Sequence, residues 1–212
     1  MRSKEESTRI IYVRHGKTDF PLDRIYCDDA EDPVLNDEGK RQAVHAAELL
    51  RGEKIDLIIA SPSNRTWMTA EAIAQTTGAG LEANAELKER RFGIWEGLFF
   101  HEIERDYPEL YQTWKLNQSA FKPEGGESVY DLLARVKAVI SEIVTQYPGK
   151  TIVVASHVGP IRVCLTDALK MPVEMYRQLN IDYGSLTRMD YGRSQNNLMY
   201  MNISSKTMGK SR

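Results

Sequence analysis

Cysteine is scarce in this sequence: two of its 212 residues are cysteines, Cys27 and Cys164. They lie far apart and match none of the short spacings by which cysteines hold a metal ion. A domain of this length buries about 70% of the surface that its unfolded chain exposes, so it needs no crosslinks to be stable. The sequence therefore argues against a disulfide-stabilised scaffold and against a cysteine-based metal site.

Long hydrophobic runs are also missing. The longer ones, such as residues 10–13 (IIYV) and 152–155 (IVVA), fall far short of the roughly 20 residues that cross a bilayer. Residues 1–9 are charged and lead directly into a strand-like segment, so no signal peptide is evident. We therefore expect no membrane partner and a cytoplasmic location.

The sequence has no large excess of either charge. Its 28 Lys and Arg residues nearly balance its 30 Asp and Glu residues, which gives a formal net charge of -2. Such a chain lacks the overall positive field that attracts nucleic acid, so we expect no nucleic-acid partner. A local positive pocket is still compatible with this balance, and the 42% of hydrophobic residues is ordinary for a globular protein.

Hydrophobic segments alternate with amphipathic ones along the chain. Short runs rich in β-branched residues predict buried strands, and longer segments with helical spacing predict helices between them. The expected strands are residues 9–13, 55–60 and 151–156, and the expected helices are residues 37–51, 63–77, 127–147 and 159–169. This order predicts one α/β domain over residues 1–212, a three-layer α/β/α sandwich whose central sheet is mostly parallel, with helices on both faces.

The middle and the end of the chain depart from this alternation. Residues 94–122 carry many aromatic side chains at helical spacings and predict a small helical cap insertion at about residues 94–125. Residues 186–190 and 198–203 predict two final strands, which could offer an edge to a second copy, so a homodimer stays open. Residues 204–212 are polar and are expected to form a flexible tail.

Charged and imidazole side chains follow three of the expected strands at the point where each strand ends. Arg14 and His15 come after the first strand, Arg65 soon after the second, and His157 after the third. Because the carboxyl ends of parallel strands meet at one edge of a sheet, we expect these four side chains to lie together. Such a cluster repels itself unless an anion lies inside it, and a phosphate dianion suits both arginine forks and a nucleophilic imidazole.

Five short motifs carry a resemblance to a known family. Residues 14–18 (RHGKT) resemble the Arg-His-Gly-x-Thr/Ser signature of the histidine phosphatase superfamily, which includes cofactor-dependent phosphoglycerate mutases. The similarity extends over about residues 9–203. The other four motifs are residues 61–66 (SPSNRT), 87–97 (LKERRFGIWEG), 126–128 (GES) and 156–159 (SHVG).

The resemblance implies a role for each matched residue. His15 would become a phosphohistidine that water then hydrolyses, while Arg14, Arg65 and His157 would hold the phosphoryl oxygens. Glu89 would protonate the leaving alkoxide and then deprotonate the attacking water. The alternative for Glu89 is a solvated charge beside the arginines that follow it. Neither a metal ion nor another cofactor is implied, and no clustered set of Asp, Glu and His ligands is visible in the sequence.

Further contacts to a small phosphorylated substrate are expected from Lys17, Thr18, Arg90 and Val158. Lys17 stands where the family usually has Glu or Gln, and it either adds a cation at the mouth of the pocket or points to solvent. Pro21 stands where many members of the family have an Asn that contacts the phosphoryl group. Both positions put the usual contacts of this pocket in question.

The cap segment is expected to cover the active site, as the resemblance implies. Its aromatic residues are core by default, because rings at helical spacing usually pack against each other. We hypothesise that some rings, with Phe99 and Phe100 as examples, select an apolar or sugar-like leaving group. His101 follows them in the sequence and is a further candidate for substrate contact.

Taken together, the motifs predict a phosphomonoester hydrolase that acts through a phosphohistidine on a small anionic metabolite. The nearest alternative is a cofactor-dependent phosphoglycerate mutase, in which Arg90 and Arg91 would form part of a second phosphate site. The segment after Gly97 has few basic residues, which favours hydrolysis. A non-catalytic phosphate-binding protein on the same fold is another alternative, although a binder needs neither a nucleophile nor an acid.

Overall fold

Six strands form one central sheet in the computed structural model of the chain, which describes residues 7–26 and 31–208. Their order across the sheet is β3-β2-β4-β1-β5-β6. The strands are β1 (Thr8–Arg14), β2 (Leu57–Ala60), β3 (Leu81–Ala83), β4 (Thr151–Ser156), β5 (Leu186–Tyr191) and β6 (Asn196–Ile203). Strand β5 runs antiparallel to β1 and β6, whereas the pairs β1–β4, β2–β4 and β2–β3 are parallel. The predicted, mostly parallel sheet is confirmed.

Strand β3 is the one element of the sheet that the sequence did not predict. It has three residues, and its side chains are exposed or half-buried. So short and polar a segment shows neither a hydrophobic run nor a clear alternation, and its position at the sheet edge follows from pairing with β2.

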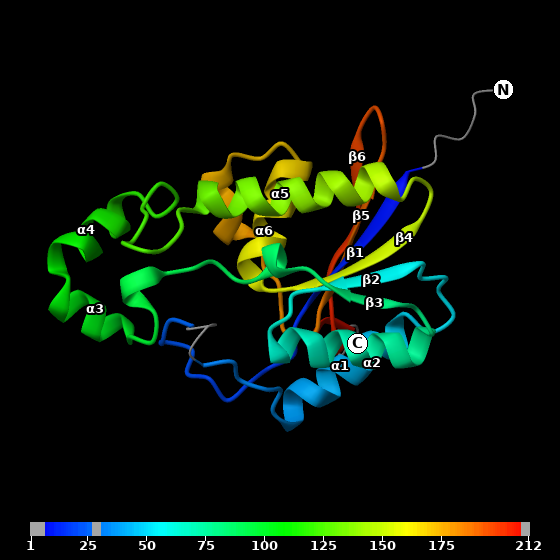
Figure 1. Cartoon of the computed structure of the whole chain (residues 1–212), viewed down its shortest axis with the longest axis horizontal. Helices are drawn as coiled ribbons and strands as arrows, with labels where there is room; N and C mark the ends of the chain where they lie inside the picture. The colour runs from blue at the N-terminus through cyan, green and yellow to red at the C-terminus, as the bar shows by residue number, and fades with distance from the viewer. Residues whose placement is uncertain (1–6, 27–30, 209–212) are drawn as a thin grey trace.

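Helices cover both faces of the sheet, as predicted. In Figure 1, α5 and α6 lie on one side of strands β2 and β4, and α1 and α2 lie on the other. The helices are α1 (Asp37–Leu49), α2 (Asn64–Thr77), α3 (Phe100–Asp106), α4 (Pro108–Leu116), α5 (Val129–Gln146), α6 (Val158–Ala168) and α7 (Ser205–Met208). The described residues also form the short 3₁₀ helices η1 (Ala85–Leu87), η2 (Gly93–Trp95) and η3 (Val173–Gln178).

The alternation of side chains along β1 joins the sheet to its two helical layers. Ile10 and Tyr12 belong to the hydrophobic core beneath α5 and α6. Ile11 and Val13 point the other way, into the core beneath α1 and α2. Because successive side chains of a strand alternate between faces, one buried strand contributes to both cores. This double burial explains the continuous apolar run in the sequence and confirms the three-layer sandwich.

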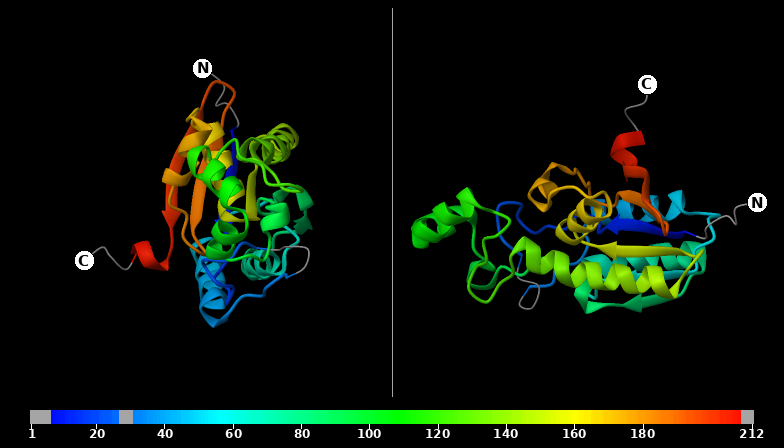
Figure 2. Two further views of the ribbon diagram at one scale, coloured as in Figure 1. Left: turned by 90° about the vertical axis from the view of Figure 1, so that its left-hand side faces the viewer. Right: turned by 90° about the horizontal axis from the view of Figure 1, so that it is seen from above.

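The predicted cap segment contains α3 and α4, which lie at one end of the molecule away from the strands (Figure 2). A third hydrophobic cluster holds it together, with Trp95, Trp114 and Phe121 among its buried residues. The ring of Trp95 stacks on Phe121 at a centroid distance of 4.8 Å and meets Trp114 edge-on at 6.2 Å. Much of the aromatic content of this segment therefore forms a small core of its own.

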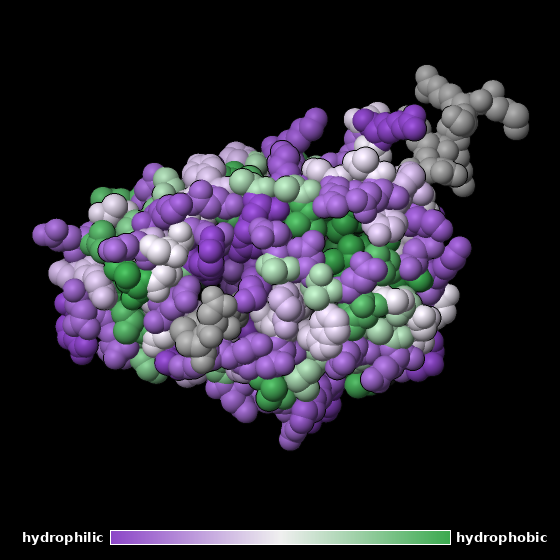
Figure 3. All heavy atoms as spheres, viewed as in Figure 1, coloured by the Kyte–Doolittle hydropathy of each residue, from purple (hydrophilic) through white to green (hydrophobic). Residues whose placement is uncertain are grey.

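The helices and the surface of the described part of the chain are polar in much of their length. None of its helices is both long and apolar enough to span a bilayer. On the face shown in Figure 3, hydrophilic side chains predominate and the hydrophobic ones form patches among them. Cys164 is a buried free thiol, and Cys27 lies outside the described residues.

The end of the chain provides an edge strand and a short helix. Strand β6 is the last strand of the sheet, and Leu198 and Met199 on it are exposed. A homodimer through this edge stays a prediction. The expected flexible tail begins with the buried Ser204 and helix α7, and residues 209–212 lie outside the described residues.

The loop after β1 contacts the first turn of α1 at two glycines. A Cβ atom built on Gly16 would lie 2.4 Å from the carbonyl oxygen of Gly39, and one built on Gly39 would lie 2.0 Å from the carbonyl oxygen of Lys17. The neighbours on both sides are backbone atoms, which cannot rotate away. The side chain of Asn36 caps the same turn by accepting a hydrogen bond from Gly39 N at 2.8 Å.

Replacing Gly39 with Ala should therefore lower the free energy of unfolding by about 1–3 kcal/mol, the usual cost of overpacking. The loss would oppose helix propensity, which favours Ala over Gly in a helix by about 0.5–1 kcal/mol. Urea denaturation measures the change. Gly80→Ala is the matched control, since the nearest atom to its added Cβ is a side-chain carbon of Leu57 at 3.7 Å. Equal urea midpoints for Gly39→Ala and the wild type would contradict the expected clash.

Candidate active site

The parallel pairing of β1 and β4 places the two predicted histidines side by side. Arg14 is in register with Ser156, so His15 and His157 follow neighbouring strand ends. The backbone N–H of His15 donates to the carbonyl of Ser156 at 3.1 Å, which continues the pairing one residue beyond β1. The two imidazole rings meet edge to face at a centroid distance of 5.2 Å.

The hydrogen bonds of His15 fix its tautomer. Its Nδ1 lies 2.8 Å from the carbonyl oxygen of Gly16, and a carbonyl can only accept. The proton is therefore on Nδ1, and Nε2 carries a free lone pair. The loop is held in turn by Thr69, whose hydroxyl accepts from Gly16 N at 3.1 Å and donates to the carbonyl of Arg65 at 2.8 Å. An imidazole held in this way is arranged as a nucleophile.

Arg65 enters the same site from the first turn of α2, directly after β2. Its guanidinium is fully buried and lies over the ring of Tyr26, 4.3 Å from the ring centroid. A nitrogen of Arg65 is 3.5 Å from a carboxylate oxygen of Asp32. Another, Nη2, donates to Nδ1 of His157 at 3.1 Å. The site thus contains a buried cation that contacts both a carboxylate and an imidazole.

The contact from Arg65 also settles the tautomer of His157. Arginine can only donate, so Nδ1 of His157 is the acceptor and Nε2 carries the proton. That N–H donates to the hydroxyl of Ser61 at 2.9 Å, with Thr66 Oγ1 at 3.3 Å. Both ring nitrogens of His157 are therefore bonded within the protein, and its predicted contact with a phosphoryl group stays a prediction.

Arg14 is held from the opposite side of the site. Its Nη1 donates to the carbonyl of Ile181 at 2.6 Å, and its guanidinium stacks on Tyr183 at 3.7 Å from the ring centroid. The ring of Tyr183 is in turn 5.6 Å from that of His15. Among the described residues, the buried Nε of Arg14 has no hydrogen-bond partner. A donor left in this way beside a nucleophile is suited to an oxygen of an anionic substrate.

Burial and the two arginines keep both imidazoles neutral. Burial lowers the pKa of His15 well below its usual value of 6.5, and the positive charges of Arg65 and Arg14 lower it further. The pKa of His157 is also well below 6.5, because of burial and then because of Arg65. Burial likewise lowers the pKa of Arg14. The site therefore has a strong positive potential around a neutral nucleophile.

Glu89 reaches the site from the segment between η1 and η2. One carboxylate oxygen accepts from the backbone N–H of Gly159 at 3.2 Å, in the first turn of α6. The other accepts from the N–H of Arg90 at 2.9 Å. A Cβ atom at Gly159 would lie 2.2 Å from a carboxylate oxygen of Glu89, so a larger residue there would displace this carboxylate from its position. Glu89 is half-buried and lines the same cleft as Arg14.

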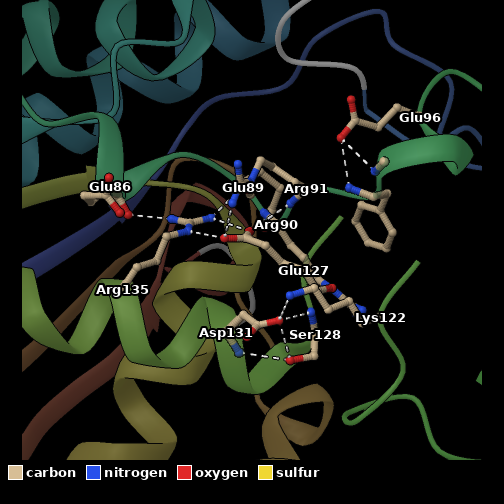
Figure 4. A network of polar contacts seen from close by, with 12 residues as sticks. Glu86, Glu89, Arg90, Arg91, Glu96, Lys122, Glu127, Ser128, Asp131 and Arg135 are labelled. Carbon is tan, nitrogen blue, oxygen red and sulfur yellow. Dashed lines mark hydrogen bonds and ion pairs between the residues drawn. The ribbon is translucent and has the colours of Figure 1, made fainter. Parts of the chain in front are cut away.

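A buried ion-pair network holds the Glu89 segment in place (Figure 4). Arg135, on α5, donates to the carbonyl of Glu89 at 2.9 Å and to the carboxylate of Glu127 at 2.7 Å. Glu127 is 3% exposed and also accepts from the N–H of Arg91 at 3.0 Å. Burial acts to raise the pKa of Glu127, but the bonds from Arg135 and Arg91 outweigh it and leave that pKa lowered.

The remaining predicted contacts fall in different places. Lys17 donates to Glu38 at 2.9 Å and is not among the residues that line the cleft with Glu89, and its predicted contact with substrate stays a prediction. The hydroxyl of Thr18 is 3.0 Å from that of Tyr26, the residue beneath Arg65. Val158 lines the cleft at the start of α6.

Arg90 has a largely structural setting. It is 7% exposed, and its Nε and Nη2 donate to the carbonyls of Glu127 at 2.7 Å and Phe121 at 2.8 Å. It still borders the cleft. The prediction that it contacts substrate is neither confirmed nor contradicted by this arrangement.

A cleft of about 250 Å³ extends from Arg14 and Glu89 towards the cap. Pro21 and Phe100 line it, whereas Phe99 and His101 do not. The position of Phe100 fits the expected role of the cap in choosing a leaving group. His101 is exposed on α3, with its ring 5.5 Å from that of Phe99.

Sequence reasoning missed several residues that shape the site, above all Tyr183, Tyr26 and Arg135. Tyr183 precedes β5, which runs antiparallel to β1, so the start of β5 lies at the end of β1. Predicting the direction of the last strands would have placed it beside His15. The bonds of Arg135 to Glu89 and Glu127 depend on how α5 packs, which no local pattern shows.

No group of three or more His, Cys, Asp or Glu side chains within residues 7–26 and 31–208 is arranged to hold a metal ion. The charges that the site does contain are mainly the two arginines beside His15.

The two neutral imidazoles predict a pH-dependent stability. Unfolded histidines have pKa values near 6.5, so the unfolded chain binds more protons than the folded one as the pH falls below neutral. The free energy of unfolding should therefore decrease from about pH 7 to pH 5, by up to about 1.4 kcal/mol per pH unit for each buried histidine. Urea denaturation at several pH values should give a smaller slope for His157→Gln. The control His101→Gln keeps both buried rings and the full slope, and a His157→Gln slope equal to the wild type would refute the assignment.

Comparisons with known proteins agree with this geometry. The model of the histidine phosphatase superfamily (branch 1) matches residues 10–204. A bifunctional protein of Mycobacterium tuberculosis is 36% identical over 185 residues, which are 87% of this chain and 50% of that protein. The chain thus spans about half the length of the first relatives that it matches.

Two further relatives match over most of their length. Phosphoserine phosphatase 1 of Hydrogenobacter thermophilus is 29% identical over 196 residues, with 92% of each chain covered. The solved structure of a mycobacterial glucosyl-3-phosphoglycerate phosphatase superposes with a TM-score of 0.82 at 28% identity, and covers 93% of this chain and 100% of that one. Because the family model spans almost the whole sandwich and includes both strand ends that carry the histidines, the chain belongs to branch 1 of the histidine phosphatase superfamily.

Proposed function

We propose that this chain is a phosphomonoesterase that acts on a small phosphorylated metabolite through a phosphohistidine at His15. One observation carries the proposal above the others. His15 is buried and neutral, with its proton on Nδ1 and the lone pair of Nε2 free, between the cations Arg14 and Arg65. A nucleophile in that state needs no base to activate it, and the arginines attract the dianion that it attacks.

In the first step, Nε2 of His15 attacks phosphorus and the bond from phosphorus to the leaving oxygen breaks. The leaving oxygen takes a proton from Glu89 in its acid form and departs as an alcohol. The positive charge that develops on the ring is stabilised by the hydrogen bond from Nδ1–H to the carbonyl of Gly16. Arg14 and Arg65 would bind the equatorial oxygens, where the charge of the transition state accumulates.

In the second step, water attacks the phosphorus of the phosphohistidine. The Glu89 carboxylate takes a proton from the water, the P–N bond breaks, and inorganic phosphate leaves. His15 returns to its neutral state with Nε2 free, and Glu89 returns to its acid form. The cycle balances without a metal ion or another cofactor, so we expect it to run in the presence of a chelator.

The setting of Arg90 supports hydrolysis over mutase chemistry. A mutase must retain a bisphosphate intermediate, and Arg90 was the first candidate for its second phosphate site. Its Nε and Nη2 donate to the carbonyls of Glu127 and Phe121. Only part of the Arg90 guanidinium group is then left to bind a ligand. Relatives whose names print a phosphatase activity, among them a phosphoserine phosphatase and a glucosyl-3-phosphoglycerate phosphatase, also support phosphate release, although one relative is named a phosphoglycerate mutase-like protein.

His15→Ala should abolish both phosphate release and the covalent intermediate. Incubation with a ³²P-labelled sugar phosphate, quenched in alkali because acid hydrolyses a P–N bond, should label the wild type and His101→Ala but not His15→Ala. Label that persists in His15→Ala would assign the nucleophile elsewhere. A wild type that binds phosphate esters but shows neither label nor phosphate release would support a non-catalytic binding protein. Conversion of 3-phosphoglycerate to the 2-phosphate without phosphate release would support a mutase.

Glu89→Gln should separate the acid step from the nucleophilic one. An alkyl phosphate needs a proton on its leaving oxygen, so kcat/KM should fall by about 10²–10⁴-fold. 4-Nitrophenyl phosphate has a leaving group that departs as the anion, so the formation of its phosphohistidine should be slowed far less in a pre-steady-state burst. Glu86→Gln is the matched control, because its side chain is exposed three residues earlier. Equal losses with both substrates would show that Glu89 is not the acid.

A further inference from the structure

The cleft beside the proposed nucleophile is lined by more positive charge than one phosphoryl group requires. Glu89 is the one carboxylate among the residues that line it. Five arginines border the same cleft: Arg14, Arg24, Arg90, Arg162 and Arg177. Arginines gathered in one cleft repel each other unless carboxylates or a bound anion compensate them. Their individual partners show where the unbalanced charge lies.

Three of the five arginines have a carboxylate partner or a role already assigned. Arg24 forms a bidentate pair with Glu31, with both distances 2.7 Å. Arg90 donates to two backbone carbonyls, and Arg14 faces the phosphoryl position beside His15. The charge of Arg24 is thus paired, Arg90 supports two backbone carbonyls, and Arg14 is assigned to the phosphoryl group.

Arg162 and Arg177 are left with no carboxylate partner among the described residues. Arg162, half-buried on α6, donates from Nε to the carbonyl of Leu179 at 2.8 Å. Arg177, exposed on η3, donates to the hydroxyl of Tyr176 at 3.3 Å and to the side-chain oxygen of Gln118 at 2.9 Å. All their partners are neutral. Neither terminal nitrogen of Arg162 has a hydrogen-bond acceptor in the described part of the chain.

Other arginines act on these two side chains. Burial lowers the pKa of Arg162 and the charge of Arg14 lowers it further, whereas Tyr176 and Glu89 act to raise it and Arg177 to lower it. Arg177 likewise contributes to the lowered pKa of Arg90, for which burial is the larger cause. The rings of Tyr176, Phe92 and Phe100 also line this cleft. In such apolar surroundings, a bound anion gains more from the arginines than it would in open water.

We propose that Arg162 and Arg177 form a second anion-binding subsite in the leaving-group part of the cleft, and that the preferred substrate is a phosphomonoester whose alcohol carries another anionic group. This inference rests on the proposed phosphatase function, because it assigns the far end of the same cleft. A carboxylate and a second phosphate share the chemistry that an arginine fork recognises. The aromatic side chains that line the same cleft suit the carbon chain that joins the two groups.

The test uses matched pairs of phosphates that differ only in their far end. A series of ω-carboxyalkyl phosphates of increasing length is compared with the ω-hydroxyalkyl phosphates of equal length, and alkanediol bisphosphates form a third arm. At the best length, the wild type should prefer an anionic end over the hydroxyl end by about tenfold or more in kcat/KM, the usual effect of a charge-assisted contact. The carboxylate and bisphosphate arms show which anion the subsite takes.

Arg177→Gln should remove most of this preference and bring the ratio of kcat/KM values towards one. Arg177 is the better first target, because Arg162 also supports the carbonyl of Leu179; Arg162→Gln is the second variant, checked by thermal unfolding. Arg193→Gln, an exposed arginine in the turn after β5, is the matched control and should keep the full ratio. A preference that survives intact in Arg177→Gln would overturn the assignment.

The failure of this inference can be told apart from the failure of the proposed function. A wild type that hydrolyses both members of each pair equally well at every length is a phosphatase without the subsite. Calorimetric titration of His15→Ala with the same pairs measures the subsite without turnover, and tighter binding of the anionic members should disappear in His15→Ala/Arg177→Gln. If no phosphate ester is hydrolysed or forms a phosphohistidine, the proposed function fails, whatever the titration shows.

Discussion

The whole site depends on the parallel hydrogen bonding of β1 to β4. The bond from His15 N to the carbonyl of Ser156 extends this pairing just past the end of β1. Both imidazoles therefore leave the sheet at the same level, from two of its central strands. A strand is stiff and buried on both faces, so a side chain at its end is positioned more precisely than one on a long loop. Arg65 completes the site because β2 is the neighbour of β4 on the other side.

Burial then decides the chemistry of these side chains. The same imidazole on the surface would be partly protonated near neutral pH and would have little use as a nucleophile. At the buried carboxyl end of β1, desolvation and two neighbouring arginines make the neutral form of His15 the stable one. The carbonyl of Gly16 then leaves the lone pair on Nε2. The fold thus supplies two things together, a neutral nucleophile and a positive field for its target, which would oppose each other in water.

How much of the site and fold is predictable from the sequence depends on which contacts are local. Strand ends are visible as apolar runs followed by polar residues, so the sequence alone places Arg14, His15, Arg65 and His157 together. The direction of β5 and the presence of β3 could not be predicted, because both depend on pairing with distant strands. Tyr183 was missed for that reason. The sequence left open whether Lys17 adds a cation to the pocket or points to solvent. Its partner Glu38 lies on another element, in the first turn of α1, so no local pattern shows the pair.

The two ends of the cleft are built differently, and this difference bears on specificity. At the phosphoryl end the polar groups are buried and contact each other, as Arg65 and His157 do. At the leaving-group end, Arg177 is exposed and rests on neutral partners from separate elements, Tyr176 and Gln118. A chemical step needs preorganised charge, whereas recognition can tolerate a side chain that adjusts to its ligand. Because few contacts fix Arg177, substitutions near it should change which ester is accepted without disturbing the nucleophile, and diversity of substrate within one fold would then arise at this end of the cleft.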